Sequence, residues 1–230
     1  MPPFTAPLFA GNRDSVANEV LGHVLAKAFG LPVPDAALIE LDASIVSNLS
    51  DPSLEEILRR ADARPKFATV MMEGYMRFDP ELTSVDVRKI IDFDSVFAFD
   101  NLIRNPDRNA IKPNMLSRSH DTCLIDHELG FEVDTNTAAQ FLRGEWADRY
   151  YRWHIFYEYL RNSRQKSKDE YFHEFEEYLK FLNINELHPY LQQIANYGYP
   201  TAKHGLVLDY LELVKKNWST FVKMIRGLVE

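Results

Sequence analysis

Apolar residues recur with the period of an α-helix near the start of the chain. Between positions 14 and 29 they stand at 16, 20, 21, 24, 25, 28 and 29, which is the spacing of one helix face. Asp14 is placed to cap this helix, Gly30 follows where a helix stops, and Pro32 and Pro34 prevent its continuation. The pattern therefore predicts a helix over 14–29 and an extended strand over 36–41.

Farther along the chain, the pattern alternates between helix and strand and then becomes entirely helical. It predicts a short helix over 52–61, a nearly all-apolar strand over 66–72, and helices over 84–103 with a break near 92–94 that stop at Asn105-Pro106. A loop over 107–113 then leads to short strands over 114–117 and 122–125. Helices are expected near 136–143, 146–162, 169–182, 186–197 and 206–228. The predicted fold class is α+β, with a small mixed portion up to residue 74 and a mostly helical portion after it.

Composition excludes several classes of protein. Hydrophobic residues make up 46% of the 230 positions, which is enough for a real core, and 26 basic against 34 acidic residues give a net charge of -8. This balance disfavours nucleic acid as a partner. No run of eighteen apolar residues and no signal-peptide pattern occur, so we expect a cytoplasmic protein without a membrane partner. Cys123 is the single cysteine, and it cannot form an internal disulfide.

Three polar residues stand next to predicted elements in the middle of the chain. Asp107 lies in the loop after a helix, Asn114 ends that loop, and Asp126 directly follows a strand. Carboxylate and amide oxygens are the ligands that Mg²⁺ takes in phosphoryl-transfer sites, which suits Asn114 and Asp126. A further carboxylate at Asp107 could orient or deprotonate an attacking hydroxyl. The order of the three residues along the chain therefore predicts a base at Asp107, an amide ligand at Asn114 and an acid ligand at Asp126.

The segments around these residues resemble a known family. FDNLIRNPDRNAIKPNML (99–116) and LIDHELGF (124–131) are similar to the catalytic core of HipA-like kinases, distant relatives of the protein kinases and the phosphatidylinositol kinases. NEVLGHVLAKAFGLPVPDAALIEL (18–41) resembles the segment of that family in which a helix carrying a Glu leads into a strand. The resemblance implies a protein-kinase-like fold with a reduced N-lobe over 1–74, a hinge near 72–75, and a helical C-lobe over 75–230 that carries the catalytic loop and the metal-binding hairpin.

The same resemblance implies the roles of the site residues. It makes Asp107 the catalytic base, Asn114 and Asp126 the Mg²⁺ ligands, and Glu19 the helix Glu that pairs with an ATP-binding lysine. Other contacts to the nucleotide would come from Met72 and Glu73 at the hinge. Lys112 departs from the family, which more often has Asn in an Asn-Pro-Asn run at this place; it either adds a cation beside the phosphates or has no role there. The implied activity is ATP- and Mg²⁺-dependent phosphotransfer to a hydroxyl, with a protein Ser or Thr as the acceptor.

The start of the sequence departs from this family pattern. The thirteen residues before Asp14 contain neither a lysine nor a Gly-rich loop, so relative to the family we expect an N-terminal truncation. Either the biological start lies upstream, or an N-terminal partner chain supplies the missing piece, or phosphotransfer has been lost. The alternative function is therefore a pseudokinase or interaction scaffold.

Each of these signals also has a plainer interpretation. Asp107 could be a turn residue of an Asn-Pro-Asp-Arg loop, and Glu19, with His23 and Lys27 at helical spacing, could lie on an ordinary solvated helix face. The residues 120, 121 and 126–128 could instead gather around a transition metal, although neighbours on an extended segment point to opposite faces. The aromatic run YYRWHIFYEYL (150–160) is expected to fill a core, and the basic run over 161–168 to be a solvated loop.

Overall fold

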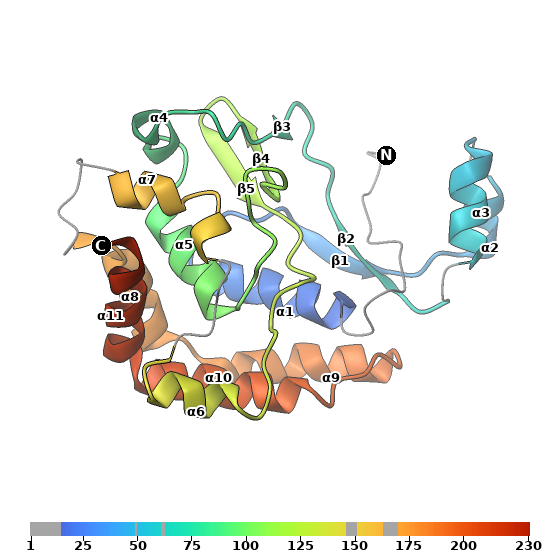
Figure 1. The fold of residues 1–230 in the computed structure, drawn as a ribbon. Coiled ribbons are helices and arrows are strands. Elements are labelled where there is room, and N and C mark those ends of the chain that lie inside the picture. The colour runs from blue at the N-terminus through green and yellow to red at the C-terminus, as the bar shows by residue number, and fades with distance from the viewer. Residues whose placement is uncertain (1–14, 49, 61–62, 146–150, 163–169) are drawn as a thin grey trace.

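A computed structural model of the protein describes residues 15–48, 50–60, 63–145, 151–162 and 170–230. Two small antiparallel sheets and a surrounding set of helices form an α+β fold (Figure 1). The α+β fold class is confirmed. Within the described residues, no helix combines the length and the apolar character that are needed to cross a bilayer.

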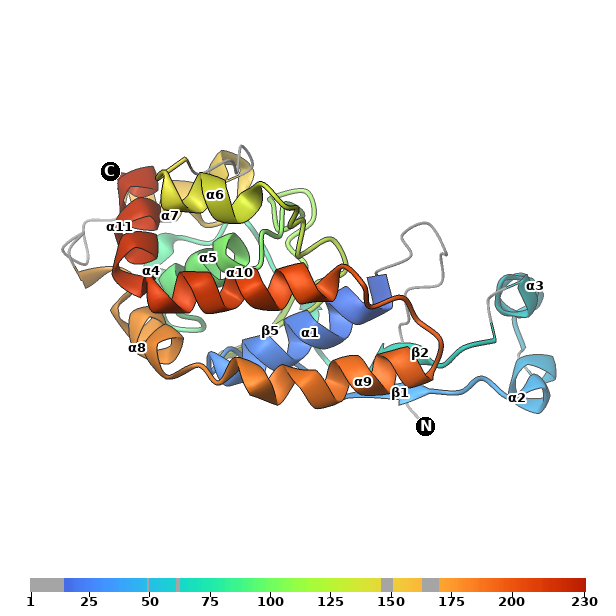
Figure 2. The same ribbon diagram turned by 90° about the horizontal axis from the view of Figure 1, so that it is seen from below.

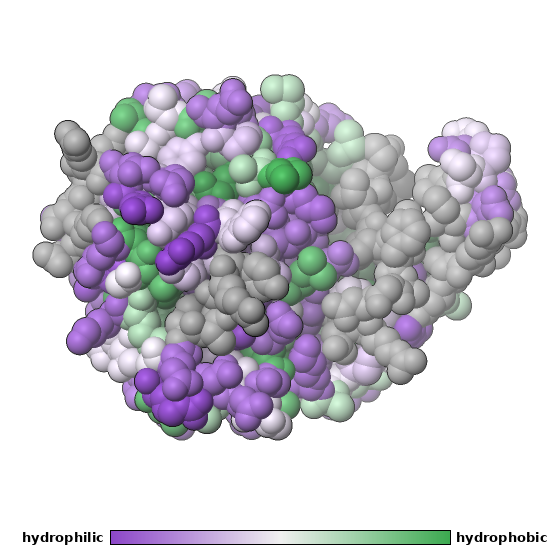
Figure 3. Space-filling view, in the orientation of Figure 1, coloured by the Kyte–Doolittle hydropathy of each residue, from purple (hydrophilic) through white to green (hydrophobic). Residues whose placement is uncertain are grey.

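The first part of the described chain contains one long helix and a two-stranded sheet. The elements are α1 (Ser15–Ala28), β1 (Ala36–Ile39), α2 (Ala43–Ser47), α3 (Pro52–Arg60) and β2 (Lys66–Thr69). β1 and β2 pair with Ala36 opposite Thr69 and Ile39 opposite Lys66. Both strands are shorter than predicted. α2 and α3 stand away from the rest of the molecule, as Figures 1 and 3 show.

The second sheet holds the predicted hairpin. β4 (Met115–Arg118) pairs with β5 (Asp121–Leu124), and β3 (Met76–Arg77) adds a third strand on the other side of β4. The hairpin was predicted to within one residue, whereas β3 was not predicted. Residues 70–75 connect the two sheets, with a turn in which the Tyr75 N–H donates to the Met72 carbonyl and Gly74 takes a φ of 74°.

The remaining elements are helical. They are α4 (Ser84–Arg88), α5 (Phe93–Leu102), α6 (Thr137–Leu142), the 3-10 helix η1 (Tyr151–Trp153), α7 (Tyr157–Asn162), α8 (His173–Phe181), the 3-10 helix η3 (Ile184–Leu187), α9 (His188–Asn196), α10 (His204–Lys216) and α11 (Trp218–Val229). The predicted break between α4 and α5 is present but covers residues 89–92 and thus begins a few residues earlier than predicted, and no described helix passes Asn105-Pro106.

Two of the long helices predicted for this part are interrupted. The helix predicted over 206–228 divides at Asn217, whose side chain donates to the Leu213 carbonyl at 2.8 Å and competes with a continuing helix. Of the helix predicted over 146–162, the described residues 151–162 form a 3-10 turn followed by α7, because His154 forms a β-bridge with Asn109. The proposed cap Asp14 and most of the basic run, residues 163–168, lie outside the described residues.

One large core holds α1, α5 and the C-terminal helices together. It contains Leu21, Leu25 and Phe29 of α1, and the Phe29 ring stacks on Phe175 of α8 at 4.8 Å between centroids. Much of the described part of the aromatic run is in this core, as predicted, since Phe156 and Leu160 are fully buried, but Trp153 is 73% exposed and does not contribute to it. A smaller cluster joins α1 to β2 and α9. Figure 2 shows α9 running along α1, so α1 is packed on more than one side.

Candidate functional site

The loop after α5 is shaped by its own asparagine. The Asn105 N–H donates to the Asp100 carbonyl at 2.8 Å, and its side-chain oxygen accepts from the Asp107 N–H at 3.1 Å. The plain turn chemistry expected of Asn-Pro-Asp is therefore present. The bond from the Asp107 N–H to Asn105 also fixes the backbone of Asp107, so Asp107 can be both a turn residue and a functional residue.

Asp107 and Asn114 lie side by side at the two ends of this loop. Asn114 donates from Nδ2 to Oδ2 of Asp107 at 3.2 Å, and Nζ of Lys112 lies 3.4 Å from the same oxygen. A carboxylate accepts only from the amide nitrogen, so this bond leaves the amide oxygen of Asn114 for another partner. Lys112 is the exposed member of the group, whereas the Asp107 side chain is mostly covered.

Asp126 is brought to Asn114 by the hairpin. The carbonyl of Asn114 accepts from the N–H of Ile125 at 3.0 Å, which places Asp126 directly beyond the last backbone bond of the β4–β5 pair. Both Asn114 (φ 47°) and Asp126 (φ 61°) have left-handed backbones, a conformation that Asn and Asp adopt more readily than other residues with a side chain. The hairpin thus joins the two ends that carry the predicted ligands.

Negative charge is concentrated here. Burial and the carboxylate of Asp107 raise the pKa of Asp126, against the opposing effect of Lys112 and Arg108. Burial and the carboxylates of Asp126 and Asp107 likewise raise the pKa of Glu128. A cation bound among these oxygens would relieve the repulsion, so the donor set of carboxylate and amide oxygens fits a hard divalent ion such as Mg²⁺.

The alternative transition-metal cluster over 120–128 is wrong for the part of the chain that the structure describes. There, no group of three or more His, Cys, Asp or Glu side chains is placed to hold a metal. His120 lies in the hairpin turn, while His127 is buried at the opposite end, against Phe99 at 6.0 Å between ring centroids. Burial and the charge of Arg108 lower the pKa of His127 to about 3, so it is a neutral packing residue.

α1 packs directly against the segment 126–130. Asn18 donates from Nδ2 to the carbonyls of Glu128 and Gly130 at 2.8 and 3.0 Å. A Cβ built on Gly22 would lie 2.4 Å from the Cβ of His127, so only glycine permits this approach. The helix that resembled the family's Glu-bearing helix therefore contacts the segment that follows the predicted acid ligand.

The solvated helix face expected at Glu19 is wrong. Glu19 and His23 are only 5% and 8% exposed. Residues 126–130 cover the side of α1 on which Glu19 lies, and the ring of Phe67 in β2 packs against the ring of His23 with 5.7 Å between the ring centroids. Burial raises the pKa of Glu19 to about 8, in spite of hydrogen bonds with the backbone of His127 and Glu128. Its Oε2 lies 3.9 Å from Nδ1 of His127, too far for a hydrogen bond.

Met72 and Glu73 lie in the turn between the two sheets. Met72 is half-buried and Glu73 exposed, and the Glu73 carbonyl accepts from Arg118 of β4 at 3.1 Å. The guanidinium of Arg118 also stacks over the ring of Tyr75 at 4.8 Å. The turn is thus tied to the hairpin that carries Asn114 and Asp126.

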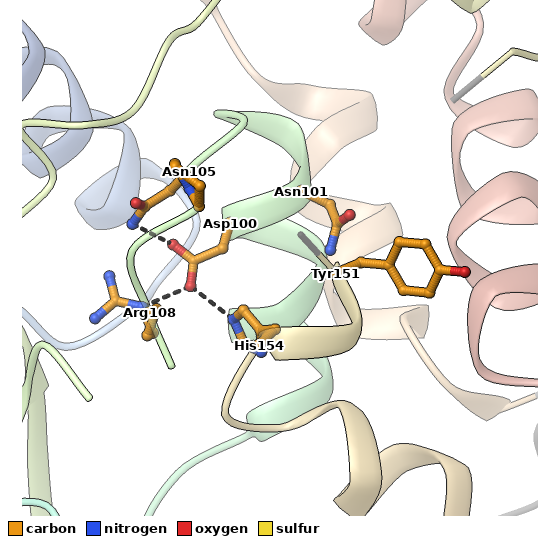
Figure 4. A pocket seen from close by; sticks show the side chains of 7 residues that line it. Asp100, Asn101, Asn105, Arg108, Tyr151 and His154 are labelled. Atoms are coloured by element: carbon orange, nitrogen blue, oxygen red, sulfur yellow. Dashed lines mark hydrogen bonds and ion pairs between the residues drawn. The ribbon is translucent and has the colours of Figure 1, made fainter. Parts of the chain in front are cut away.

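The sequence interpretation overlooked a buried polar network beneath the loop. Asp100 of α5 accepts from Arg108 at 2.5 Å, from His154 at 3.0 Å and from Asn105 at 3.0 Å (Figure 4). Although burial alone would raise the pKa of Asp100, the charge of Arg108 and the hydrogen bond of His154 hold it well below its usual range. The small pocket that Figure 4 shows among these residues and Asn101 and Tyr151 has room for little more than a water molecule. The signal that could have revealed the network is a charged residue within a mostly apolar helix, as Asp100 is in SVFAFDNLI (95–103).

A comparison with models of protein families gives a match for this chain. The model of the HipA-like kinase family matches residues 9–184. That range includes α1, both sheets, the loop of Asp107 and the segment of His154. Among curated proteins, none matches this sequence.

Proposed function

This chain belongs to the HipA-like kinase family, and we propose that it transfers a phosphoryl group from ATP to a hydroxyl group, with a Ser or Thr side chain of a protein as the acceptor. The observation that carries the proposal is the convergence of Asp107, Asn114 and the start of the 126–130 segment through two bonds of Asn114, one from its side chain to Asp107 and one from Ile125 to its carbonyl. Kinase-like sites need a base and two oxygen ligands at such a junction.

Asn114 and Asp126 are the residues that would hold Mg²⁺. The amide oxygen of Asn114 is available because its nitrogen is engaged by Asp107, and the carboxylate of Asp126 stands among other acidic groups whose repulsion a cation offsets. When bound between these two residues, Mg²⁺ would offset the negative charge of the phosphate oxygens of ATP, which would supply the phosphoryl group.

Asp107 would act as the base. Its carboxylate is oriented by Asn114 and Lys112, both of which contact Oδ2. A hydroxyl within hydrogen-bond reach of this carboxylate would donate its proton to it as the hydroxyl oxygen bonds to the γ-phosphorus of ATP. The bond from that phosphorus to the oxygen that bridges it to the β-phosphate would break, and ADP would leave. The cation of Lys112, which is mostly exposed, would lie beside the phosphates.

The remaining nucleotide contacts would come from α1 and from the turn that joins the two lobes, 1–74 and 75–230. Backbone groups of Met72 and Glu73 in this turn would meet the base of the nucleotide. Glu19 is kept uncharged near neutral pH by burial and by Asp126 and Glu128. An ammonium group brought to it would favour its ionised form, as expected of a carboxylate that pairs with a phosphate-binding lysine.

Calorimetric titration of ATP into the purified chain, with and without Mg²⁺, tests this proposal. We expect binding that depends on Mg²⁺, with a Kd of roughly 0.1–1 mM because few contacts hold the nucleotide. Asp126→Ala should abolish this binding. Asp107→Asn should leave it nearly unchanged, because Asp107 is assigned to the hydroxyl and not to the metal.

Asp121→Ala is the matched control, since Asp121 lies at the exposed turn of the same hairpin, away from Asn114. It should bind like the wild-type chain. Equal binding by Asp126→Ala and wild type would contradict the assignment of the metal ligand. Absence of any Mg²⁺-dependent binding by the wild-type chain would instead favour the interaction scaffold.

A further inference from the structure

Arg108, the residue after the proposed base, is fully buried and bonds to both sides of the site. Its Nη1 donates to the carbonyl of Asn114 and lies 3.4 and 3.5 Å from the carbonyls of Pro113 and Ile125. Asn114 ends the loop, while Ile125 directly precedes Asp126. One guanidinium nitrogen is therefore shared between the backbone at one proposed ligand and the backbone next to the other.

The two ligand positions need such support. Asn114 and Asp126 both have positive φ angles, which Asn and Asp tolerate better than other residues with a side chain but which are still less favourable than ordinary extended or helical angles. Asn114 precedes β4 and Asp126 follows β5, so neither residue lies within the paired strands. A buried cation that binds carbonyls from both segments holds the two backbones together, because charge-assisted hydrogen bonds are stronger than neutral ones.

The position of Arg108 is itself set by its partners. Nε donates to Asp100, and the carbonyl of Arg108 accepts from the Ile155 N–H at 3.0 Å. His154 accepts from the Phe156 N–H at its Nδ1, so its proton is on Nε2 and is donated to Asp100. Figure 4 shows Arg108, His154 and Asn105 around the Asp100 carboxylate. The orientation of the Arg108 guanidinium is thus fixed by Asp100 of α5, which is itself held by His154 from the segment before α7.

We infer that Arg108 is a positioning residue which, through Asp100 and His154, holds Asn114 and Asp126 at the spacing that one divalent cation requires. The inference rests on the proposed function for its metal, but its structural part, the joining of the two segments, can be measured without any ligand. Lysine cannot replace arginine here, because an ammonium at the end of a flexible stem cannot bond to Asp100 and to the Asn114 and Ile125 carbonyls in one fixed plane.

The test compares Arg108→Lys with Arg88→Lys. Arg88 is a matched control because it also pairs with a buried aspartate, Asp94, at 2.8 Å, but belongs to α4 and touches none of the site residues. The first measurement is amide hydrogen exchange at Ile125, whose N–H bonds to the Asn114 carbonyl. The second is the affinity for Mn²⁺ in the presence of ATP, measured by electron paramagnetic resonance.

We expect Arg108→Lys to exchange the Ile125 amide at least tenfold faster and to bind Mn²⁺ about 10–100-fold more weakly, the range found when groups behind metal ligands are changed. Arg88→Lys should change neither value, although it makes the same replacement of guanidinium by ammonium beside a buried aspartate. A folded Arg108→Lys protein with wild-type exchange or wild-type Mn²⁺ affinity would overturn the inference. So would equal changes in the two variants, which would mark a general loss of stability.

The outcomes also separate this inference from the proposed function. If the wild-type chain binds no Mn²⁺ with ATP, the proposed function fails. Faster exchange at Ile125 in Arg108→Lys then still supports the clamp between the two segments, and unchanged exchange overturns it. Should Arg108→Lys not fold, Asp100→Asn, which keeps the size of the side chain but weakens the hold on Arg108, takes its place with the same measurements.

Discussion

Replacing Gly22 with alanine should separate α1 from the segment that follows Asp126. The new Cβ would lie 2.4 Å from Cβ and 2.8 Å from Cγ of His127, whereas carbon atoms in contact prefer about 3.5–4.0 Å. One of the two backbones must therefore move by about 1 Å or more. His127 is itself 2% exposed and packed against Phe99, so it has no space into which to withdraw.

The expected loss of stability follows from two opposing effects. Overpacking of a buried site costs about 1–3 kcal/mol, while alanine in place of glycine inside a helix gains about 1 kcal/mol. Gly227→Ala isolates the second effect, because Gly227 lies within α11 and a Cβ built there would have no neighbour within 4 Å. We therefore expect Gly22→Ala to be less stable than Gly227→Ala by about 1–3 kcal/mol, which corresponds to roughly 2–12 °C in Tm for a chain of this size.

Thermal unfolding of the two variants, followed by circular dichroism, measures this difference. Gly22→Ala should also weaken Mg²⁺-dependent ATP binding, because the two bonds from Asn18 to the backbone of Glu128 and Gly130 would be strained by the same movement. If Gly22→Ala is as stable as Gly227→Ala, α1 does not pack against residues 126–130 as described, and the reasoning is refuted.

Two further predictions concern charged groups near the site. The pKa of Glu19 is raised from 4.5 to about 8 on folding, so the folded state holds a proton that the unfolded chain has lost, and the contribution of Glu19 to stability should fall as pH rises from about 4.5 to 8. The buried His23 and His127, whose pKa values are lowered, act in the opposite direction in both proteins, so the free energy of unfolding of Glu19→Gln should rise relative to that of wild type across this range in urea unfolding. A difference between the two proteins that does not change with pH would show that Glu19 does not titrate in this way. Asp126→Asn removes a carboxylate that is repelled by Asp107 and Glu128, so without metal it should raise Tm. A lower Tm, measured in EDTA, would mean that the Asp126 charge is compensated within the chain.

Much of the fold follows from local sequence. Helical spacing and the stop signals Gly30 and Asn105-Pro106 predicted α1, α4 and α5 close to their observed ends. These signals are reliable because a helix is built from contacts between residues three and four apart, and its ends depend on the residues at the boundary. The hairpin was predicted for the same reason, since the two strands are separated by a tight turn.

The candidate site was predicted in part. Asp107, Asn114 and Asp126 each stand at the end of a local element, so their order along the chain indicated a common site and the family to which the chain belongs. The buried contacts beneath these three residues could not be predicted from their order along the chain. Asp100 and His154 are 54 residues apart, and no local rule pairs them.

Whether a polar residue is buried was decided only by the tertiary structure. Glu19 and His23 have the helical spacing of a solvated face, and the sequence by itself determined that spacing and the helix that carries it. Residues 126–130 and β2 then cover both side chains. Because the hydrophobic period of a helix records only which side chains are apolar, it does not reveal when a second, polar surface packs against the other side. The packing of α1 turned an apparently solvated carboxyl into a buried, protonated one beside the proposed site.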